Sequence, residues 1–266
     1  MNLTISLAQL NIQLAQPRAN LALASTWISE AAQRGSQLIL LPELWTSGYD
    51  LSNARAHAET NRGEILPQLA SLAQEHQVAV GGSLLLEQDG KVFNTFVFLP
   101  ADGEEPAFYA KIHLFRLMAE DRWLSPGNHL QHVHAGCGEA GLAVCNDLRF
   151  PEMFRRYSLA VANLFLISAE WPLQRIAHWQ TLLRARAIEN QCFVAATNCT
   201  GVTGAETFGG CSAVISPWGE TLVEGTPDQL ELLTTTIDLD QVSKVRQRIP
   251  ILQDRRPDLY GDMVKS

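Results

Sequence analysis

Three segments of the chain place a reactive or charged residue directly after an apolar run. Glu43 ends LLPE, Lys111 lies in YAKIHLF, and Cys145 begins CNDLRFPE after the run GLAV. In α/β proteins ligands bind outside the carboxyl ends of strands, so residues at such ends are candidates for a shared site. A cysteine nucleophile needs a base to take its proton and a cation or N–H donors to stabilise the oxyanion. Glutamate, lysine and cysteine supply those three parts.

Each of these residues also has an ordinary structural explanation when it is taken alone. A Glu after a strand commonly caps a helix or is solvated, a Lys at a strand edge protects that edge, and a Cys ending an apolar strand is commonly a small buried hydrophobe. The combination favours catalysis, because a structural protein has no physical need for a base, a cation and a thiol at three strand ends.

The hydropathy pattern predicts the elements that would position these residues. Alternating or wholly apolar runs indicate strands, and apolar residues at helical spacing indicate helices. The expected strands are 3–11, 37–44 (ended by Pro42), 78–82, 83–88, 91–99, 141–145, 163–168, 192–198, 209–216, 220–225 and 230–236, with a hairpin turn at Asp89-Gly90. The expected helices are 18–34, about 65–76, one from about Pro151, 174–190 and one from about Asp238.

Hairpins and doubly buried strands that alternate with helices predict a layered α/β sandwich, although the pattern leaves the strand order open. The chain has 266 residues, of which 46% are hydrophobic and 18% charged. These values are typical of folded globular proteins, and α/β folds of about 250 residues commonly form one unit. The sequence therefore predicts a single domain over residues 1–266.

Charge and cysteine usage exclude several classes of partner and compartment. The formal charge is 20 − 28 = −8, and no Lys/Arg-rich run is present, so nucleic acid is not an expected partner. The N-terminus lacks a basic segment and no apolar run approaches about 18 residues, so we expect neither a signal peptide nor a membrane span. The odd number of cysteines without a CxxC pair argues against a disulfide framework and for a reducing, cytoplasmic location. The cysteines are Cys137, Cys145, Cys192, Cys199 and Cys211.

Other motifs are weaker. His129, His132 and His134 could suggest a metal site, but only the last two would share a strand face and no carboxylate has ligand spacing. The glycines between 201 and 210 neither follow a strand nor open a helix in the order of a dinucleotide fingerprint. We therefore expect no metal and no nucleotide cofactor.

The three segments resemble the nitrilase (carbon–nitrogen hydrolase) superfamily, whose Glu-Lys-Cys triad matches Glu43, Lys111 and Cys145 in order and in flanking sequence. The resemblance covers nearly the whole chain. It includes the segment EDRWLSPGN, in which Glu120 matches the family's second glutamate, and the stretch from Trp171 to Cys192. It implies an αββα fold that forms a four-layer assembly with a second subunit, a homodimer or larger homo-oligomer, and no metal or organic cofactor.

The resemblance also implies roles for the residues. Cys145 would attack an amide carbonyl, Glu43 would act as general base, and Lys111 would stabilise the oxyanion before water resolves the thioester. The backbone N–H of Asn146 would be a second oxyanion donor, and Glu120 would position Lys111 or the substrate. A free thiol has a pKa of about 8.5. The helix expected near Pro151 is too distant to lower it, so activation would depend on Lys111 and Glu43.

The segment after the nucleophile points to one branch of the superfamily. The run CNDLRFPE resembles the Cys-Tyr-Asp-Leu-Arg-Phe-Pro-Glu pattern of the ω-amidase branch, and the run VRQRIPILQDRRPDLYG from Val245 resembles that branch's C-terminus. Asn146 stands where the branch usually has Tyr, which leaves the pocket wall in question. The branch acts on dicarboxylic acid monoamides such as 2-oxoglutaramate and succinamate.

A dicarboxylate substrate predicts an arginine in the pocket, because the guanidinium pairs with carboxylate through two hydrogen bonds. Arg175 is the candidate, while Arg149 is expected to fix the backbone near the nucleophile together with Glu152. Tyr49 and Trp171 are candidates for the pocket walls. The alternatives left open are an amidase acting on deaminated glutathione, an N-carbamoyl hydrolase, and a non-catalytic scaffold of the same fold.

Overall fold

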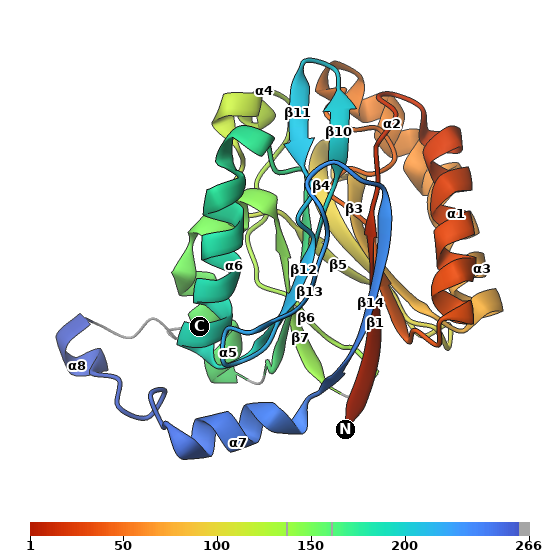
Figure 1. The fold of residues 1–266 in the computed structure, drawn as a ribbon. Helices are drawn as coiled ribbons and strands as arrows, with labels where there is room; N and C mark the ends of the chain where they lie inside the picture. Colours follow the sequence, from red (N-terminus) through yellow and green to blue (C-terminus); the bar gives the residue numbers. More distant parts are fainter. Residues whose placement is uncertain (137, 161, 261–266) are drawn as a thin grey trace.

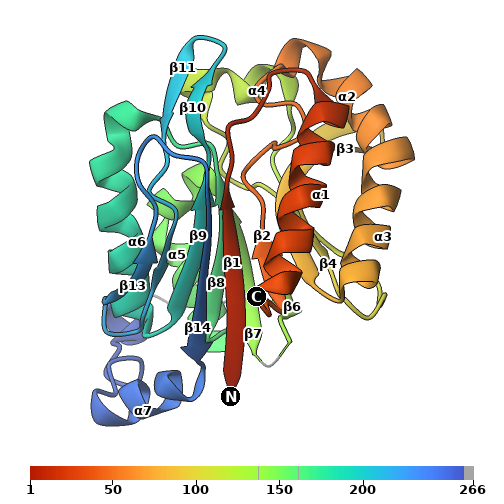
Figure 2. The same ribbon diagram turned by 45° about the vertical axis from the view of Figure 1, so that its right-hand side comes forward.

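Two mixed β-sheets pack face to face and helices cover both outer faces (Figures 1 and 2). This computed structural model describes residues 1–136, 138–160 and 162–260. Cys137 lies outside the described residues. The arrangement of helix, sheet, sheet and helix confirms the α/β sandwich that the sequence predicts.

The first sheet has the order β14-β1-β2-β3-β4-β5. Strand β2 runs parallel to β1 and to β3, whereas the other neighbours are antiparallel. Its strands are β1 (Asn2–Gln9), β2 (Leu38–Leu40), β3 (Ala79–Gln88), β4 (Lys91–Leu99), β5 (Ala107–Ala110) and β14 (Glu231–Asp238).

The second sheet has the order β13-β12-β9-β8-β7-β6, with β7, β8 and β9 parallel at its centre. A separate hairpin, β10-β11, extends beyond the end of β9. The strands are β6 (His132–His134), β7 (Glu139–Val144), β8 (Leu164–Ala169), β9 (Phe193–Asn198), β10 (Thr200–Thr203), β11 (Glu206–Gly209), β12 (Ala213–Ile215) and β13 (Thr221–Glu224).

Helices α1 and α3 lie against the first sheet, and α5 and α6 lie on the second sheet's side (Figure 1). The α-helices are α1 (Pro17–Gln33), α2 (Ala54–Thr60), α3 (Leu66–His76), α4 (Glu120–Trp123), α5 (Pro151–Ala160), α6 (Ile176–Asn190), α7 (Asp240–Arg248) and α8 (Pro257–Tyr260). Short 3₁₀ turns cover Leu51–Asn53, Arg116–Met118, Cys145–Arg149 and Leu173–Arg175, and a π-helical turn covers Asn61–Ile65.

Successive side chains of a strand point to opposite faces of its sheet, and this alternation decides which residues form the core. In β1, Leu3, Ile5 and Leu7 point toward the second sheet, whereas Ala8 packs on the helix side. All six residues of β8 are buried, because a strand at the centre of a sheet covered on both faces has no solvent side. Each buried Leu or Ile contributes about 2 kcal/mol of burial free energy, so the two sheets form a firm support for groups at their ends.

The strand ends bring the chemistry-bearing residues to one region between the sheets. Cys145 follows β7 and Glu170 follows the adjacent parallel strand β8. Glu43 follows β2 and Lys111 follows β5 in the facing sheet. The sandwich therefore joins residues from two sheets across their interface.

Several boundaries differ from the sequence-based expectations. The expected strands 78–82 and 83–88 form one strand, β3, because the Gly81-Gly82 pair stays extended and leaves room for Leu40 and Leu41. Helix α2 was not expected. The expected strand 209–216 is split into β11 and β12, since Cys211 adopts a positive φ of 53° that interrupts the extended chain.

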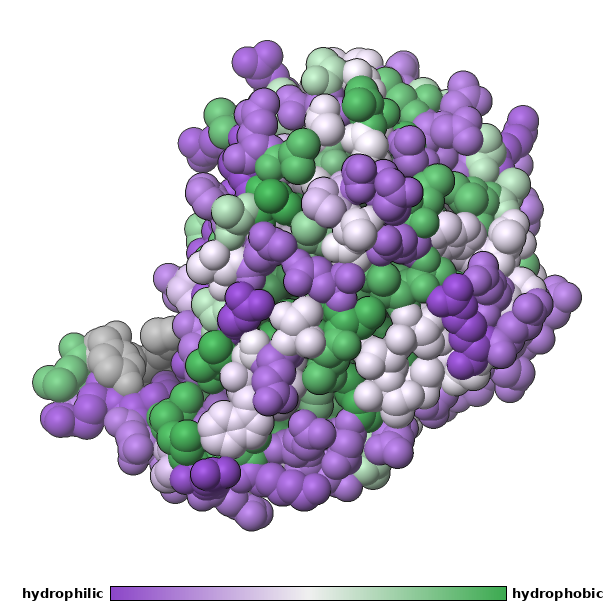
Figure 3. All heavy atoms as spheres, viewed as in Figure 1, coloured by the Kyte–Doolittle hydropathy of each residue, from purple (hydrophilic) through white to green (hydrophobic). Residues whose placement is uncertain are grey.

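The last helices leave the body of the molecule. Helices α7 and α8 form an arm that projects from the end of β14 (Figures 1 and 2). On the face of Figure 3, polar residues dominate the rim and the arm, while apolar residues show mainly over the central strands. Among the described helices none is long and apolar enough to cross a membrane.

Candidate active site

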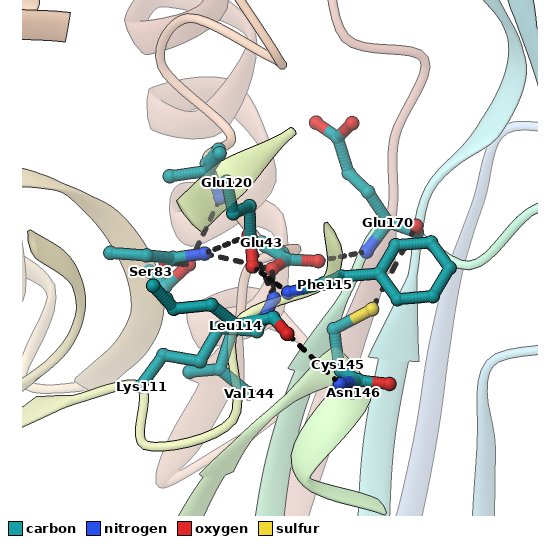
Figure 4. Close-up of polar contacts among 12 residues, drawn as sticks. Glu43, Ser83, Lys111, Leu114, Phe115, Glu120, Val144, Cys145, Asn146 and Glu170 are labelled. Carbon is teal, nitrogen blue, oxygen red and sulfur yellow. Dashed lines mark hydrogen bonds and ion pairs between the residues drawn. The ribbon is translucent and has the colours of Figure 1, made fainter. Parts of the chain in front are cut away.

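A buried ion cluster occupies the space between the two sheets (Figure 4). Lys111 Nζ lies 2.7 Å from Glu43 Oε1 and 2.8 Å from Glu120 Oε1. All three side chains are fully buried. Moving three charged groups out of water costs several kcal/mol per ion. Buried ion clusters of this kind are therefore found mainly at functional sites.

Two polar residues that the sequence analysis missed hold this cluster in place. Asn94 Nδ2 donates to Glu43 Oε1 at 2.8 Å and to Glu120 Oε1 at 3.3 Å. Ser83 Oγ donates to Asn94 Oδ1 at 2.8 Å and accepts the Leu44 N–H at 3.0 Å. The available signal was a polar residue at a fully buried position of an apolar strand, because such a residue must find hydrogen-bond partners.

Tyr49 belongs to the ion cluster. Its hydroxyl donates to Glu120 Oε1 at 3.1 Å, and the backbone N–H of Phe115 donates to the other oxygen of Glu120. Glu120 therefore contacts Lys111 directly, and through the Phe115 N–H it also anchors the loop that follows Lys111. Sequence analysis expected Tyr49 as a pocket wall, but the structure directs its hydroxyl to the glutamate.

The charges set the protonation of the cluster. Burial opposes the ammonium form, but the carboxylates of Glu120 and Glu43 outweigh it and raise the pKa of Lys111. Burial also raises the pKa of Glu120, although the nearby ammonium group partly counteracts this. Lys111 is therefore a permanent cation at neutral pH, as an oxyanion-stabilising group must be.

The nucleophile candidate lies at a sharp turn. Cys145 directly follows β7, has a positive φ of 44°, and begins a 3₁₀ turn that continues to Arg149. The first N–H groups of a helical turn have no acceptor within the turn, so the N–H of Asn146 is available to an oxyanion. Its side-chain amide donates to the backbone oxygens of His113 and Leu114 at 3.2 and 3.4 Å, which fixes this residue beside the Lys111 loop.

Asp147 connects the nucleophile turn with the Lys111 segment. One of its oxygens accepts from the Val144 N–H at 2.9 Å and the Tyr109 hydroxyl at 2.8 Å. The other accepts from the N–H and Nδ1 of His113 at 3.0 and 2.8 Å. Tyr109 and His113 lie two residues on either side of Lys111, so this buried carboxylate fixes the position of the lysine relative to Cys145.

Burial and the Glu43 carboxylate raise the pKa of Cys145 well above its usual value, although Lys111 opposes the shift. The resting residue is therefore a thiol. A base must therefore take the proton as the sulfur attacks, and the role of Glu43 as that base stays a prediction.

A pocket of about 450 Å³ opens next to this turn. It is lined by Leu114, Phe115, Arg116, Leu117, Asn146, Arg149, Arg175 and His178. A narrower cavity shares four of these residues and reaches Cys145, Trp171 and Pro172. A larger groove of about 760 Å³ along β3, β4 and β5 contains none of the three triad residues. We therefore assign the site to the narrower cavity, which includes Cys145, and to the 450 Å³ pocket with which it shares four residues.

Two arginines line the pocket without an acidic partner among the described residues. Arg175 stacks over Phe115 at 5.4 Å and its buried Nε has no hydrogen-bond acceptor. Arg149 lies 4.5 Å over the Trp171 ring. Both residues line the same two cavities. Burial lowers the pKa of Arg149, an effect that Cys145 opposes and the charge of Arg175 reinforces.

The position of Arg149 corrects a sequence-based expectation. The guanidinium was expected to fix the nucleophile backbone together with Glu152, but it stacks on Trp171 in the pocket because the 3₁₀ turn rotates it inward. Trp171 lines the inner cavity as expected, and its indole N–H donates to the Arg175 carbonyl oxygen at 2.8 Å.

Glu170 is a third residue that the sequence analysis missed. Its backbone N–H donates to Glu43 Oε2 at 2.9 Å, and its carbonyl oxygen lies 3.9 Å from the Cys145 sulfur as a weak acceptor (Figure 4). A charged residue directly after the mostly apolar run LFLISA, one strand from the nucleophile, was the available signal. Among the described residues, no group of three or more His, Cys, Asp or Glu side chains could hold a metal ion; the absence of a cofactor stays a prediction.

Comparisons with known proteins identify the family. A sequence profile of the carbon–nitrogen hydrolase family matches residues 4–247. The 2-oxoglutaramate amidase of Bacillus subtilis (strain 168) is 41% identical over 98% of this chain and 100% of its own length. The omega-amidase NIT2 of Homo sapiens is 32% identical over 98% of both chains.

One solved structure of similar fold contains a covalent adduct. It is a variant of the amidase from Nesterenkonia sp. AN1, which superposes with a TM-score of 0.86 at 29% identity and covers 97% of this chain and 95% of that one. In that protein the acetamide moiety of fluoroacetamide is covalently added at the active-site cysteine.

Proposed function

Because the chain belongs to the carbon–nitrogen hydrolase family, we propose that it is an amidase that releases ammonia from the terminal amide of a small dicarboxylic acid monoamide, such as 2-oxoglutaramate. The observation that carries the substrate class is the pair Arg149 and Arg175, two guanidinium groups with no acidic partner among the described residues, in the cavity that reaches Cys145. An anionic substrate would supply the missing partner.

The proposed reaction uses a triad of Glu43, Lys111 and Cys145. The thiol proton passes to Glu43 as the sulfur attacks the amide carbon, and the oxyanion lies between Lys111 and the N–H of Asn146. Glu43 then returns the proton to the leaving nitrogen, and ammonia departs from a thioester. Water activated by the same carboxylate hydrolyses the thioester.

Glu120 acts in this scheme as a positioning residue. Its contact with Lys111 at 2.8 Å balances the ammonium charge when Glu43 becomes protonated, so the lysine keeps one carboxylate partner throughout the cycle. The hydrogen bond from Tyr49 supports the same oxygen. Neither residue needs to contact the substrate.

The experiment that tests the function is ammonia release from a panel of amides. The panel contains succinamate, 2-oxoglutaramate, glutamine, deaminated glutathione, an N-carbamoyl amine and a simple nitrile, with Cys145→Ala beside the wild type. We expect activity confined to the dicarboxylate monoamides and none in the variant.

Other outcomes would change specific parts of the proposal. A preference for deaminated glutathione or the carbamoyl compound would keep the triad and change the substrate. Activity that survives in Cys145→Ala would remove the nucleophile. If the wild type releases ammonia from no compound of the panel, the non-catalytic scaffold is favoured.

We also propose a homodimer that works in the cytoplasm. The projecting arm exposes Ile249 and Leu259, which are 42% and 71% accessible, and a second subunit would cover such side chains. All four described cysteines are free thiols, which fits a reducing compartment.

A further inference from the structure

One buried carboxyl group has no part in the reaction as described. The Glu170 side chain is fully buried, and neither of its oxygens has a hydrogen-bond partner among the described residues. Leaving such a group without hydrogen bonds destabilises the folded protein. A carboxyl that stays unpaired beside a reaction centre therefore suits a ligand that arrives during turnover.

The location of Glu170 connects it with both the base and the nucleophile. Its own backbone holds Glu43 Oε2 and lies against the Cys145 sulfur, while Figure 4 shows its side chain extending away from the sulfur. Apart from burial, the Glu43 charge is the strongest influence that raises the pKa of Glu170. Burial and this charge favour the protonated acid, and the backbone N–H of the same residue holds the carboxyl group that would handle the leaving nitrogen.

The charge of the surroundings selects the kind of ligand. Glu43 and Glu120 place two carboxyl groups around one ammonium group, Lys111, so acidic groups outnumber basic ones in this cluster. A negative cluster repels a carboxylate but attracts a small cation. The two arginines would take the far carboxylate of the substrate, so its nitrogen end would lie toward Glu43, whose Oε2 accepts the Glu170 N–H.

We propose that Glu170 receives the ammonia released from the thioester-forming step, protonates it and holds it as ammonium. This inference rests on the proposed amidase function and adds a catalytic residue to it. After the C–N bond breaks, the O–H bond of Glu170 breaks and an N–H bond forms, which gives an ammonium ion beside a carboxylate.

The step removes the one nucleophile that could reverse the reaction. Ammonium has no lone pair, so it does not attack the thioester, whereas ammonia retained at the same place would re-form the amide. When ammonium leaves, the Glu170 carboxylate takes a proton from water, and the overall products at neutral pH are a carboxylate and ammonium.

Binding of ammonium tests the proposal without turnover. The thermal midpoint of Cys145→Ala is measured in ammonium chloride and in potassium chloride at equal ionic strength, since potassium is a cation of similar size. We expect ammonium alone to raise the midpoint, and the effect to grow from pH 6 to pH 8 because binding displaces the Glu170 proton. The effect should disappear in Cys145→Ala/Glu170→Gln and persist in Cys145→Ala/Glu152→Gln, where the same change is made at an exposed carboxyl on α5.

Kinetics supply the second readout. Glu170→Gln should lower kcat about 10- to 100-fold with a smaller change in KM, whereas Glu170→Asp, which keeps the acid, should recover part of the loss. Added ammonium should inhibit the wild type more than potassium does, and this difference should vanish in Glu170→Gln. If Glu170→Gln does not fold, Glu170→Asp carries the comparison.

The outcomes separate the two proposals. Equal responses to ammonium and potassium, or an unchanged ammonium response after Glu170→Gln, would overturn the role of Glu170. Ammonium binding that depends on Glu170 would survive even if no panel amide is hydrolysed, so failure of the amidase proposal is recognised separately.

Discussion

Lys111 is the side chain whose burial most constrains the chemistry at the residue scale. A lysine is almost never fully buried unless it is paired, and here two carboxylates at 2.7 and 2.8 Å pair with it. A structural ion pair has one carboxylate, whereas Lys111 pairs with two. In the proposed reaction Glu43 accepts a proton while Glu120 remains as the partner of the lysine.

Replacement of Glu43, the proposed base, should greatly slow the reaction without unfolding the protein. Glu43→Gln keeps the shape of the side chain but cannot take the Cys145 proton, so kcat should fall by about 10²- to 10⁴-fold. Ammonia release measures the effect. Glu64→Gln makes the same change at a surface residue paired with Arg18 and should remain fully active. A Glu43→Gln enzyme within tenfold of the wild type would refute the base role.

The two pocket arginines should control affinity for charged substrates. A hydrogen bond to a charged group contributes about 1.5 to 3 kcal/mol, so Arg149→Gln or Arg175→Gln should raise KM for succinamate about 10- to 150-fold. An uncharged amide of similar length should lose much less. Steady-state kinetics with both amides tests this, with the exposed Arg18→Gln as the control. Equal losses for both substrates would mean that the arginines shape the pocket without pairing with a carboxylate.

The buried acid Glu170 should also be visible in the stability of the protein. Burial raises its pKa, so the folded protein keeps a proton that the unfolded chain releases above about pH 4.5. Unfolding then releases a proton, and this group's contribution to stability falls with rising pH by up to about 1.4 kcal/mol per unit. The free energy of unfolding of Glu170→Gln, relative to the wild type, should therefore increase between pH 5 and pH 7 in urea titrations. A difference that does not change with pH would contradict the raised pKa.

At the scale of elements, the turn after β7 and the segment around Lys111 act as one unit. The positive φ of Cys145 is a strained backbone state for a residue with a side chain, and such states persist only where the surroundings determine them. Asp147 supplies that support through four hydrogen bonds to both segments.

Removal of this support should affect both stability and rate. Asp147→Ala leaves several buried donors without an acceptor, so it should destabilise the protein by about 3 to 5 kcal/mol and lower kcat. Tyr109→Phe removes one hydrogen bond and should cost about 1 kcal/mol with nearly normal kcat. Urea titration and ammonia release on the same samples measure both effects. Normal kcat in a folded Asp147→Ala protein would show that the turn holds its geometry unaided.

At the scale of the whole molecule, the arm formed by α7 and α8 is the least enclosed part of the described chain (Figure 2). It carries exposed apolar side chains, whereas the sandwich buries most of its own. The single-domain organisation over residues 1–266 and the pairing of two subunits both stay predictions.

Light scattering of the purified protein tests the assembly. We expect a mass of about twice 29.4 kDa at micromolar concentration, because a second subunit would cover the apolar side chains of the arm. Ile249→Asp and Leu259→Asp should weaken the assembly, since they place charges at the expected interface. A mass of one chain across the whole concentration range would contradict the homodimer.

The sequence by itself determined the family, the sandwich and the three residues that the site brings together. Those features depend on local signals: an apolar run buried on both faces, a turn at its end, and a reactive residue type at that turn. The substrate class that the resemblance implies pointed to Arg175, and Trp171 was a candidate for the pocket wall; both line the cavity that reaches Cys145. These local signals can be recognised in a sequence because each depends on a few consecutive residues.

Only the tertiary structure decided which polar side chains surround those residues. Asn94 and Ser83 reach the ion cluster from neighbouring strands, Arg149 turns into the pocket, Tyr49 turns to Glu120, and Glu170 lies unpaired behind the base. The physical reason is that these contacts join sheets and strands far apart in the chain, where hydrogen-bond direction and burial depend on packing across the sandwich. No local pattern of residues carries that information.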